Sequence, residues 1–302
     1  LDAMHVNWLG LSLKCYLPKS DNSLSYVWES LKGKISYCNI KRLMFSSGWR
    51  YYAEIVVSGA APTRVSIGTS TMGIDPGVST IAGVSEDACV LEELAPNAIQ
   101  YEKKIQKISQ RMDRSRRISN PNKYNEDGTI NRSNRDPWKY SKNYVKMCRL
   151  LKSLYRKKHA YIVDSHRELC NKLLSIARYF PVEKMHFQAL QKRSKETKRQ
   201  EKKTEVKQKD GTVKVIQKYK RKKRFGRSIN RRAPARFLLE LKRKAEAVGG
   251  VYAEVDTKEF KASQYNHVTD TYEKIPLSQR EKEIGKRKVQ RDIYSAFLIR
   301  NA

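Results

Sequence analysis

Two apolar runs on either side of a turn constrain the fold most strongly. They lie in MGIDPGVSTIAGV, residues 72–84, where Asp75-Pro76-Gly77 separates them. Proline presets one backbone angle and glycine accepts angles that other residues avoid, so this tripeptide favours a tight turn. The segment therefore predicts two adjacent strands buried at the centre of a sheet, with the Asp75 carboxylate at the end of the first. That position suits an ordinary turn residue and a functional acid equally.

Two more carboxylates stand in contexts that suit a shared site. In YFPVEKMHF, residues 179–187, Glu183 interrupts a short apolar strand. An unpaired carboxylate in a buried strand is costly unless a cation neutralises it. In VQRDIYSAFLI, residues 289–299, Asp292 falls in the first turn of an expected helix. Each acid also has a simpler interpretation, Glu183 as a solvated strand end and Asp292 as a complement to the helix dipole.

Net charge indicates the class of partner. The 302 residues include 63 Lys or Arg and 31 Asp or Glu, for a net charge of +32. Such a surplus repels itself unless a polyanion neutralises it, which favours nucleic acid. The sequence has no apolar run of about 18 residues and no basic helix with a wide apolar face. We therefore expect nucleic-acid partners and no membrane contact.

The cysteines argue against a zinc site. All five are scattered and none forms a C-x-x-C pair, so neither a zinc ribbon nor a disulfide framework is indicated. We expect no zinc and a reducing, cytoplasmic setting.

The most basic stretch covers residues 192–236. It is poor in apolar residues and includes Asp210-Gly211, so we expect part of it to form a mobile hairpin or to stay unstructured until a partner binds. A charge run can be solvated surface or a localisation signal, but beside an acidic site it favours contact with phosphates. The candidate nucleic-acid-binding residues are Lys192, Arg193, Lys195, Lys220, Arg221, Lys222, Lys223, Arg224, Arg227, Arg231 and Arg232.

Periodicity divides the rest of the chain. A β-rich front precedes two long basic helices, which form a helical hairpin around a polar loop at 120–136. Aromatic residues at 49–52 would either pack a sheet or stack bases. The expected strands are 9–17, 34–45, 49–57, 88–91 and 251–255, the expected helices are 96–119, 141–178 and 233–248, and the expected irregular segment is 257–288.

Three stretches together resemble the RuvC nuclease motifs of the TnpB family of transposon-encoded RNA-guided DNA endonucleases and of the related compact type V CRISPR effectors. GIDPGVST resembles the first motif, VEKMHFQALQKR the second and VQRDIYSAFLI the third, which puts Asp75, Glu183 and Asp292 at the acidic positions. KKRFGRSINRRAPARFLLELKRKAEAVGG also resembles the basic segment and helix of these proteins. The likeness covers roughly residues 34–302.

The resemblance implies a mixed α/β fold of the α+β type. Residues 63–302 would form an RNase H-like RuvC nuclease domain, with a helical hairpin insertion at about 98–178 and a basic insertion at about 192–232. Residues 257–288 would be a zinc-ribbon remnant without cysteines, and residues 1–62 the C-terminal part of a β-rich, wedge-like domain of oligonucleotide-binding type. The family's N-terminal recognition half would be either omitted or carried by a separate chain.

By resemblance the protein is a metal-dependent endonuclease that cuts DNA selected by a guide RNA. Asp75, Glu183 and Asp292 would hold two Mg²⁺ or Mn²⁺ ions about 3.5 to 4 Å apart, one activating water and one stabilising the leaving oxygen. The partners would be the guide RNA, the target heteroduplex and the displaced DNA strand. The implied location is the cytoplasm of a prokaryote, at the nucleoid when in use.

Three alternatives stay open at this point. A shifted alignment would place Gln188, a poor ligand for Mg²⁺, at the second acidic position and leave a guided binder that does not cut. An unguided resolvase or transposase would keep the nuclease fold without the guide. A basic scaffold would bind RNA or DNA without catalysis.

Overall fold

The computed structural model describes residues 3–19, 21–45, 47–62, 66–191, 199–207, 211–219, 225–256, 261–276 and 278–302. Helix accounts for 39% and strand for 31%, so the chain is mixed α and β, as expected. Two compact units make up the chain. One comprises Leu1–Ile67, Ala95–Ser175 and Glu246–Gly250, and the other Gly68–Leu94, Ile176–Ala245 and Val251–Ala302.

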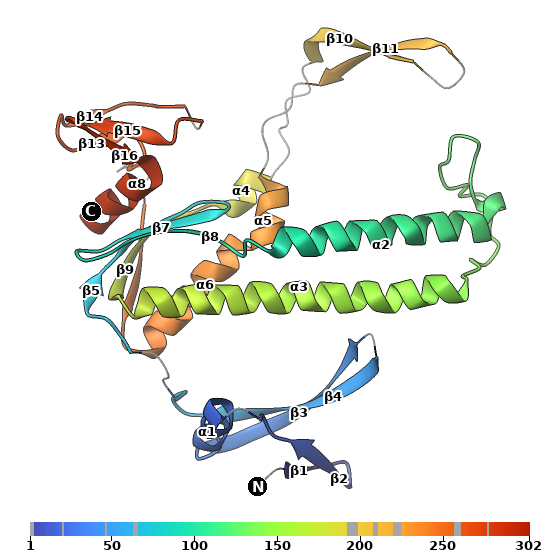
Figure 1. Ribbon diagram of the computed structural model, residues 1–302, viewed down its shortest axis with the longest axis horizontal. Helices are drawn as coiled ribbons and strands as arrows, with labels where there is room; N and C mark the ends of the chain where they lie inside the picture. The colour runs from blue at the N-terminus through green and yellow to red at the C-terminus, as the bar shows by residue number, and fades with distance from the viewer. Residues whose placement is uncertain are drawn as a thin grey trace. The chain divides into compact units, whose positions relative to one another are not determined.

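The first unit opens with two β-hairpins and, between them in the sequence, a short helix that the sequence analysis does not predict (Figure 1). The expected strands at 34–45 and 49–57 are confirmed as an antiparallel pair. The strand expected at 9–17 begins later, because Leu9 and Gly10 form the first hairpin's turn with φ angles of 47° and 78°. These elements are β1 (Ala3–Trp8), β2 (Leu11–Tyr16), α1 (Asp21–Ser30), β3 (Lys34–Phe45) and β4 (Gly48–Ser58).

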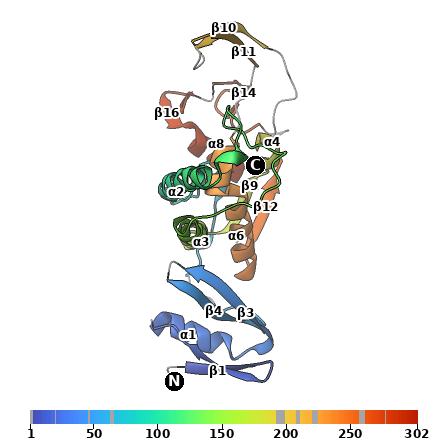
Figure 2. The same cartoon turned by 90° about the vertical axis from the view of Figure 1, so that its right-hand side faces the viewer.

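Two long helices complete the first unit, as their periodicity predicts: α2 (Ala98–Ser119) and α3 (Lys142–Leu174). They lie side by side in both views (Figure 2), and the rings of Tyr101 and Tyr161 lie 5.8 Å apart between them. Helix α3 ends at Leu174 and not at the predicted residue 178, because strand β9 already begins at Ala177. Within the ranges given above, no helix has both the length and the apolar character needed to cross a membrane.

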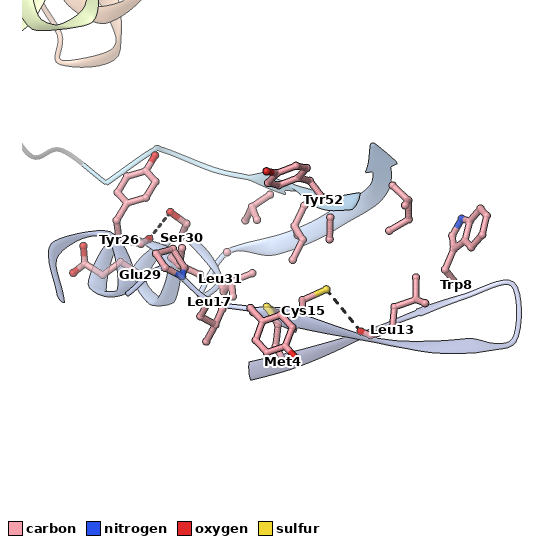
Figure 3. Close-up of a pocket in the computed structure, with 18 of the residues that line it drawn as sticks. Met4, Trp8, Leu13, Cys15, Leu17, Tyr26, Glu29, Ser30, Leu31 and Tyr52 are labelled. Carbon is pink, nitrogen blue, oxygen red and sulfur yellow. Dashed lines mark hydrogen bonds between the residues drawn. The ribbon is translucent and has the colours of Figure 1, made fainter. Parts of the chain in front are cut away.

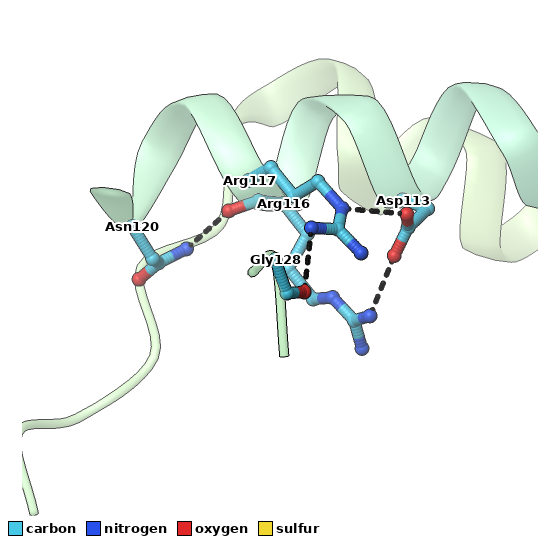
Figure 4. A network of polar contacts seen from close by, with 5 residues as sticks. All are labelled: Asp113, Arg116, Arg117, Asn120 and Gly128. Carbon is cyan, nitrogen blue, oxygen red and sulfur yellow. Dashed lines mark hydrogen bonds and ion pairs between the residues drawn. The ribbon is translucent and has the colours of Figure 1, made fainter. Parts of the chain in front are cut away.

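The loop between these helices is organised around a buried ammonium group. Lys123, at the end of the short helix η1 (Pro121–Lys123), donates from Nζ to the backbone carbonyls of Asn134 and Asp136. Asn120 bridges the two ends of the loop by donating to the carbonyls of residues 116 and 139. Near the end of helix α2, Asp113 pairs with Arg116 and Arg117. Arg117 also reaches the loop, where it donates to the Gly128 carbonyl (Figure 4).

A six-stranded mixed sheet forms the centre of the second unit. Its path is β12-β9-β6-β7-β8, so the strand that carries Asp75, β6, lies in the middle. Strand β6 pairs antiparallel with β7 and parallel with β9, and Ile74 and Ile81 are fully buried, as the apolar runs predict. The turn predicted at residues 75–77 lies at 77–79 instead, because Asp75 and Pro76 still pair with Ala82 and Ile81 in the sheet. The strands are β5 (Ser70–Thr71), which pairs with β9, β6 (Gly73–Pro76), β7 (Thr80–Val84), β8 (Cys89–Glu93), β9 (Ala177–Glu183) and β12 (Val251–Val255).

Helix α8 (Arg291–Arg300) packs directly on strand β6 at Gly73. A Cβ at Gly73 would lie 2.2 Å from the Ala296 carbonyl oxygen and 2.4 Å from the Arg300 backbone nitrogen. Only glycine therefore lets the helix backbone come this close to the strand. Because β6 carries Asp75 and α8 carries Asp292, this contact helps to determine the distance between the two acids.

Gly73→Ala is expected to lower the free energy of unfolding by about 3 kcal/mol, at the upper end of the cost of overpacking, because the new methyl group meets backbone rather than a movable side chain. Thermal unfolding followed by circular dichroism measures the change. Gly226→Ala, in helix α5 (Gly226–Arg232), is the matched control, since its added Cβ comes no closer than 3.9 Å to the atoms it would meet. Equal melting temperatures for the two variants would contradict the close packing of α8.

The remaining helices and the basic hairpin of the second unit follow strand β9. This strand ends at Glu183 and does not continue to Phe187, where a short helix begins. The helix expected at 233–248 is confirmed, and part of the basic stretch forms an antiparallel hairpin. The elements are α4 (Phe187–Gln191), β10 (Arg199–Lys207), β11 (Val213–Tyr219), α5 and α6 (Pro234–Ala247).

The prediction of an irregular segment at 257–288 is wrong for the described part. Two small hairpins lie there, and the second extends to Gln290, into the start of the expected helix. Buried Lys282 joins the hairpins by donating from Nζ to the carbonyls of Gln264, at 2.9 Å, and Tyr265, at 2.8 Å. Tyr265, Ile284 and Val289 pack these hairpins against helix α8, but such scattered apolar residues do not alternate, so the sequence pattern does not show the strands. They are β13 (Tyr265–Asn266), β14 (Thr271–Tyr272), β15 (Glu281–Ile284) and β16 (Arg287–Gln290).

Candidate metal centre

Strand register brings Asp75 beside Glu183. Ile74 on β6 pairs with Val182 on the parallel strand β9, so the next residue on each strand lies at the same level of the sheet. Side chains at one level of neighbouring strands point to the same face. Asp75 and Glu183 accordingly lie within hydrogen-bonding range of each other.

Asp292 reaches the same place from helix α8. Gly73 on β6 contacts Ala296 on the helix. From Gly73 to Asp75 the strand advances about 6.6 Å, and from Ala296 back to Asp292 the helix covers about 6 Å. Both acids therefore lie within about one helical turn, along the chain, of the same contact, and the negative charge of Asp292 acts on the Asp75 carboxyl. Three elements that are distant in sequence therefore place Asp75 against Glu183 and within electrostatic reach of Asp292.

Burial and neighbouring charges raise the pKa of the Asp75 carboxyl well above its ordinary value. Burial of the carboxyl is the largest cause, followed by the charge of Glu183, the hydrogen bond with Glu183 and the charge of Asp292, while the Arg291 charge opposes them. Each cause except Arg291 disfavours a second or third negative charge in a small volume. A cation bound between these oxygens would remove that repulsion, so the donor set fits a metal ion.

The Asp292 carboxylate is held by its own neighbours. Its Oδ1 lies 3.3 Å from Arg291 Nη2, and its Oδ2 lies 3.6 Å from Arg280 Nη1 and 3.3 Å from Gln290 Nε2. Gln290 also begins helix α8, because its side-chain oxygen accepts a 2.7 Å hydrogen bond from the Ile293 N–H. One side chain thus caps the helix and orients the acid.

The chemistry of the donors suits a hard divalent cation. Carboxylate oxygens are the ligands that Mg²⁺ and Mn²⁺ prefer, and the set contains no sulfur or imidazole. In the described part of the chain, no three Asp, Glu, His or Cys side chains form a group already arranged to hold an ion. With guanidinium groups on both Asp292 oxygens, ion binding would require these contacts to change.

The other described residues named from the sequence lie outside this group of acids. Gln188 lies on helix α4 and is exposed, whereas Glu183 is the residue beside Asp75. On α5, Arg227 is exposed and Arg231 is half-buried, and Arg232 pairs with Glu93 on β8. The remaining basic candidates, Lys192, Arg193, Lys195, Lys220, Arg221, Lys222, Lys223 and Arg224, lie outside the described residues.

Three residues at the site were missed by the sequence analysis: Arg280, Gln290 and Arg291. Gln290 and Arg291 directly precede Asp292, and this adjacency was the only signal in the sequence. Arg280 lies in the segment expected to be irregular, which gave no reason to place it near an acid. No protein-family model matches this chain, and no curated protein matches it in sequence.

A separate groove of about 1740 Å³ lies in the first unit, among the two hairpins and helix α1 (Figure 3). Apolar side chains such as Leu13, Leu31 and Tyr52 line it. Nearby, Trp49 and Tyr51 are 47% and 65% exposed. The Arg42 guanidinium lies over the Trp49 ring, 4.2 Å from its centroid, so the exposed Tyr51 ring is the more accessible for stacking.

Proposed function

We propose that the chain is the nuclease lobe of an RNA-guided DNA endonuclease that uses metal ions. The observation that carries the proposal is the convergence of Asp75, Glu183 and Asp292, one from each of the three motif-like stretches. An acid in one motif can be coincidence. Three acids brought together by a central strand, its parallel neighbour and the C-terminal helix support a common site.

The arrangement of the sheet supports an RNase H-like fold. In such a domain the first strand presents a metal ligand and pairs antiparallel with the next at the centre of the sheet. Strand β6 ends beside the acidic cluster, is the middle strand and pairs antiparallel with β7. Both strands are buried, as an inner pair requires.

The side chains of the site would act as metal ligands, and one of them, Asp75, carries a proton that affects this role. When protonated, the Asp75 carboxyl hydrogen-bonds with Glu183, and the Asp75 proton must leave before both Asp75 oxygens can act as ligands. Gln290 and Arg291 orient Asp292 from its own helix end. Bound Mg²⁺ or Mn²⁺ ions would supply an activated water and stabilise the leaving oxygen of the cut phosphodiester.

The charge of the chain supports nucleic acid as its partner. A net charge of +32 exceeds what a site for one small substrate needs, and it suits both a guide RNA and a DNA duplex. In guided systems base pairing selects the target while the protein holds the backbone. On this proposal the protein works in the cytoplasm, on DNA.

Sequencing the RNA that co-purifies with the chain tests the proposal. We expect a discrete RNA species, and we expect DNA complementary to part of it to be cut only when Mg²⁺ or Mn²⁺ is present. Cleavage that is independent of RNA would instead indicate an unguided resolvase or transposase. RNA-directed binding without cleavage at any metal concentration would indicate a guided binder.

The basic stretch is expected to carry much of the salt dependence of nucleic-acid binding. Each phosphate that a basic side chain neutralises adds about 0.9 to the slope of log affinity against log salt on duplex DNA. Replacing residues 220–224, KRKKR, with glutamine should therefore flatten this slope by several tenths to a few units, as measured by fluorescence anisotropy. Exchanging Lys for Arg and Arg for Lys at these positions keeps the charge and should preserve the slope. An unchanged slope in the glutamine variant would identify these residues as solvated surface.

A further inference from the structure

Both oxygens of the Asp292 carboxylate are engaged by groups that a metal ion would have to share or replace. Arg291 contacts Oδ1, and Arg280 and Gln290 contact Oδ2. Two of the three partners are cations, and cations compete for the lone pairs of one carboxylate. The two guanidinium groups differ in how firmly they are held.

Arg291 is fixed in place. Its side chain is 11% exposed, its Nη1 donates to the Gln279 carbonyl at 3.4 Å, and its backbone N–H donates to the Arg280 carbonyl at 2.8 Å. Its charge also reaches Asp75 and lowers the pKa of that carboxyl. We expect Arg291 to stay where it is when an ion binds.

The Arg280 backbone is anchored, but its side chain is held loosely. Its side chain is 65% exposed, and 3.6 Å from Asp292 Oδ2 is an ion-pair distance, too long for a strong hydrogen bond. The chain around Arg280 is anchored. The Arg280 carbonyl accepts a hydrogen bond from the Arg291 N–H, and the Nζ of buried Lys282 donates to two backbone carbonyls. The guanidinium can therefore swing into solvent without disturbing the fold.

We propose that Arg280 is an electrostatic competitor of the metal ion for Asp292 and so sets the ion concentration at which the site fills. This inference rests on the proposed metal site. The exposed ion pair is weak and readily exchanged, so Arg280 does not block the site. It shifts the affinity instead. A guanidinium about 5 Å from a divalent ion, screened by physiological salt, corresponds to roughly a threefold to tenfold change in the dissociation constant.

Mn²⁺ binding measured by electron paramagnetic resonance on the full chain tests the competition. Binding at the site is defined as the portion that Asp75→Asn removes. Arg280→Gln should bind Mn²⁺ at that site roughly threefold to tenfold more tightly than the wild type, and the difference should shrink as ionic strength rises. Arg280→Lys keeps the charge and should resemble the wild type.

Arg287→Gln is the matched control, because it makes the same charge change at an exposed position of the same hairpin. An Arg280→Gln affinity equal to that of the wild type or of Arg287→Gln would overturn the competition while leaving the metal site intact. If Asp75→Asn removed no Mn²⁺ binding at all, both the metal site and this inference would fall.

Discussion

Asp75→Ala and Asp292→Ala are each expected to lower metal-dependent DNA cleavage by about a hundredfold or more, with nucleic-acid binding retained. Metal ions supply several kcal/mol of transition-state stabilisation, and each 1.36 kcal/mol is a factor of ten in rate. Asp75 lies on the central strand and Asp292 on the helix that packs against that strand at Gly73, and the charge of Asp292 acts on Asp75. Single-turnover cleavage of a matched DNA in Mg²⁺, together with binding measured by fluorescence anisotropy, separates the two effects.

Asp87→Ala is the control for this experiment. Asp87 is exposed in the turn between β7 and β8, so its replacement makes the same charge change in the same sheet away from the cluster. Its cleavage rate should equal that of the wild type. Wild-type cleavage by the Asp292→Ala protein would remove that residue from the site, and a parallel loss of binding and cleavage would point to phosphate contacts or misfolding.

Asp75→Asn is expected to make the protein more stable near neutral pH. The folded state raises the pKa of Asp75 above its ordinary value of 3.8, chiefly through burial and the charge of Glu183. At pH values between 3.8 and the raised pKa, the folded chain binds more protons than the unfolded chain, so the free energy of unfolding falls as pH rises. Above the raised pKa the wild type carries the full cost of the buried charge, which the neutral amide avoids. The advantage of the variant should vanish as pH falls below 3.8.

Melting temperatures from about pH 3 to pH 8, with and without Mn²⁺, check this prediction. An ion that binds only the folded state adds about 2.7 kcal/mol when its free concentration is a hundred times its dissociation constant. The wild type should gain this stabilisation and Asp75→Asn should not, so saturating Mn²⁺ should reduce or reverse the order of stability. Asp87→Asn should leave the pH profile unchanged. A less stable Asp75→Asn protein at neutral pH without added ion would contradict the repulsion inferred at the site.

The sequence by itself determined the elements whose signals are local. The two paired central strands, the hairpin at 34–57 and the two long helices follow from apolar periodicity and from turn residues, although the central turn lies at 77–79 and not at the predicted 75–77. These features depend on neighbours a few positions away, so they are visible in a single chain. The three acids could also be named from their contexts, because each stands at the end or start of an apolar element.

Only the tertiary structure decided what surrounds those acids. Arg280 meets Asp292 because two small hairpins without a periodic signature are joined by Lys282 and pack on helix α8 through Tyr265, Ile284 and Val289. Gly73, which looks like any strand glycine, proves to be the contact on which α8 lies. Register between β6 and β9 is a long-range pairing, and it puts Glu183, not Gln188, beside Asp75. Such contacts join segments far apart in the chain, and their free energy depends on partners that no local pattern specifies.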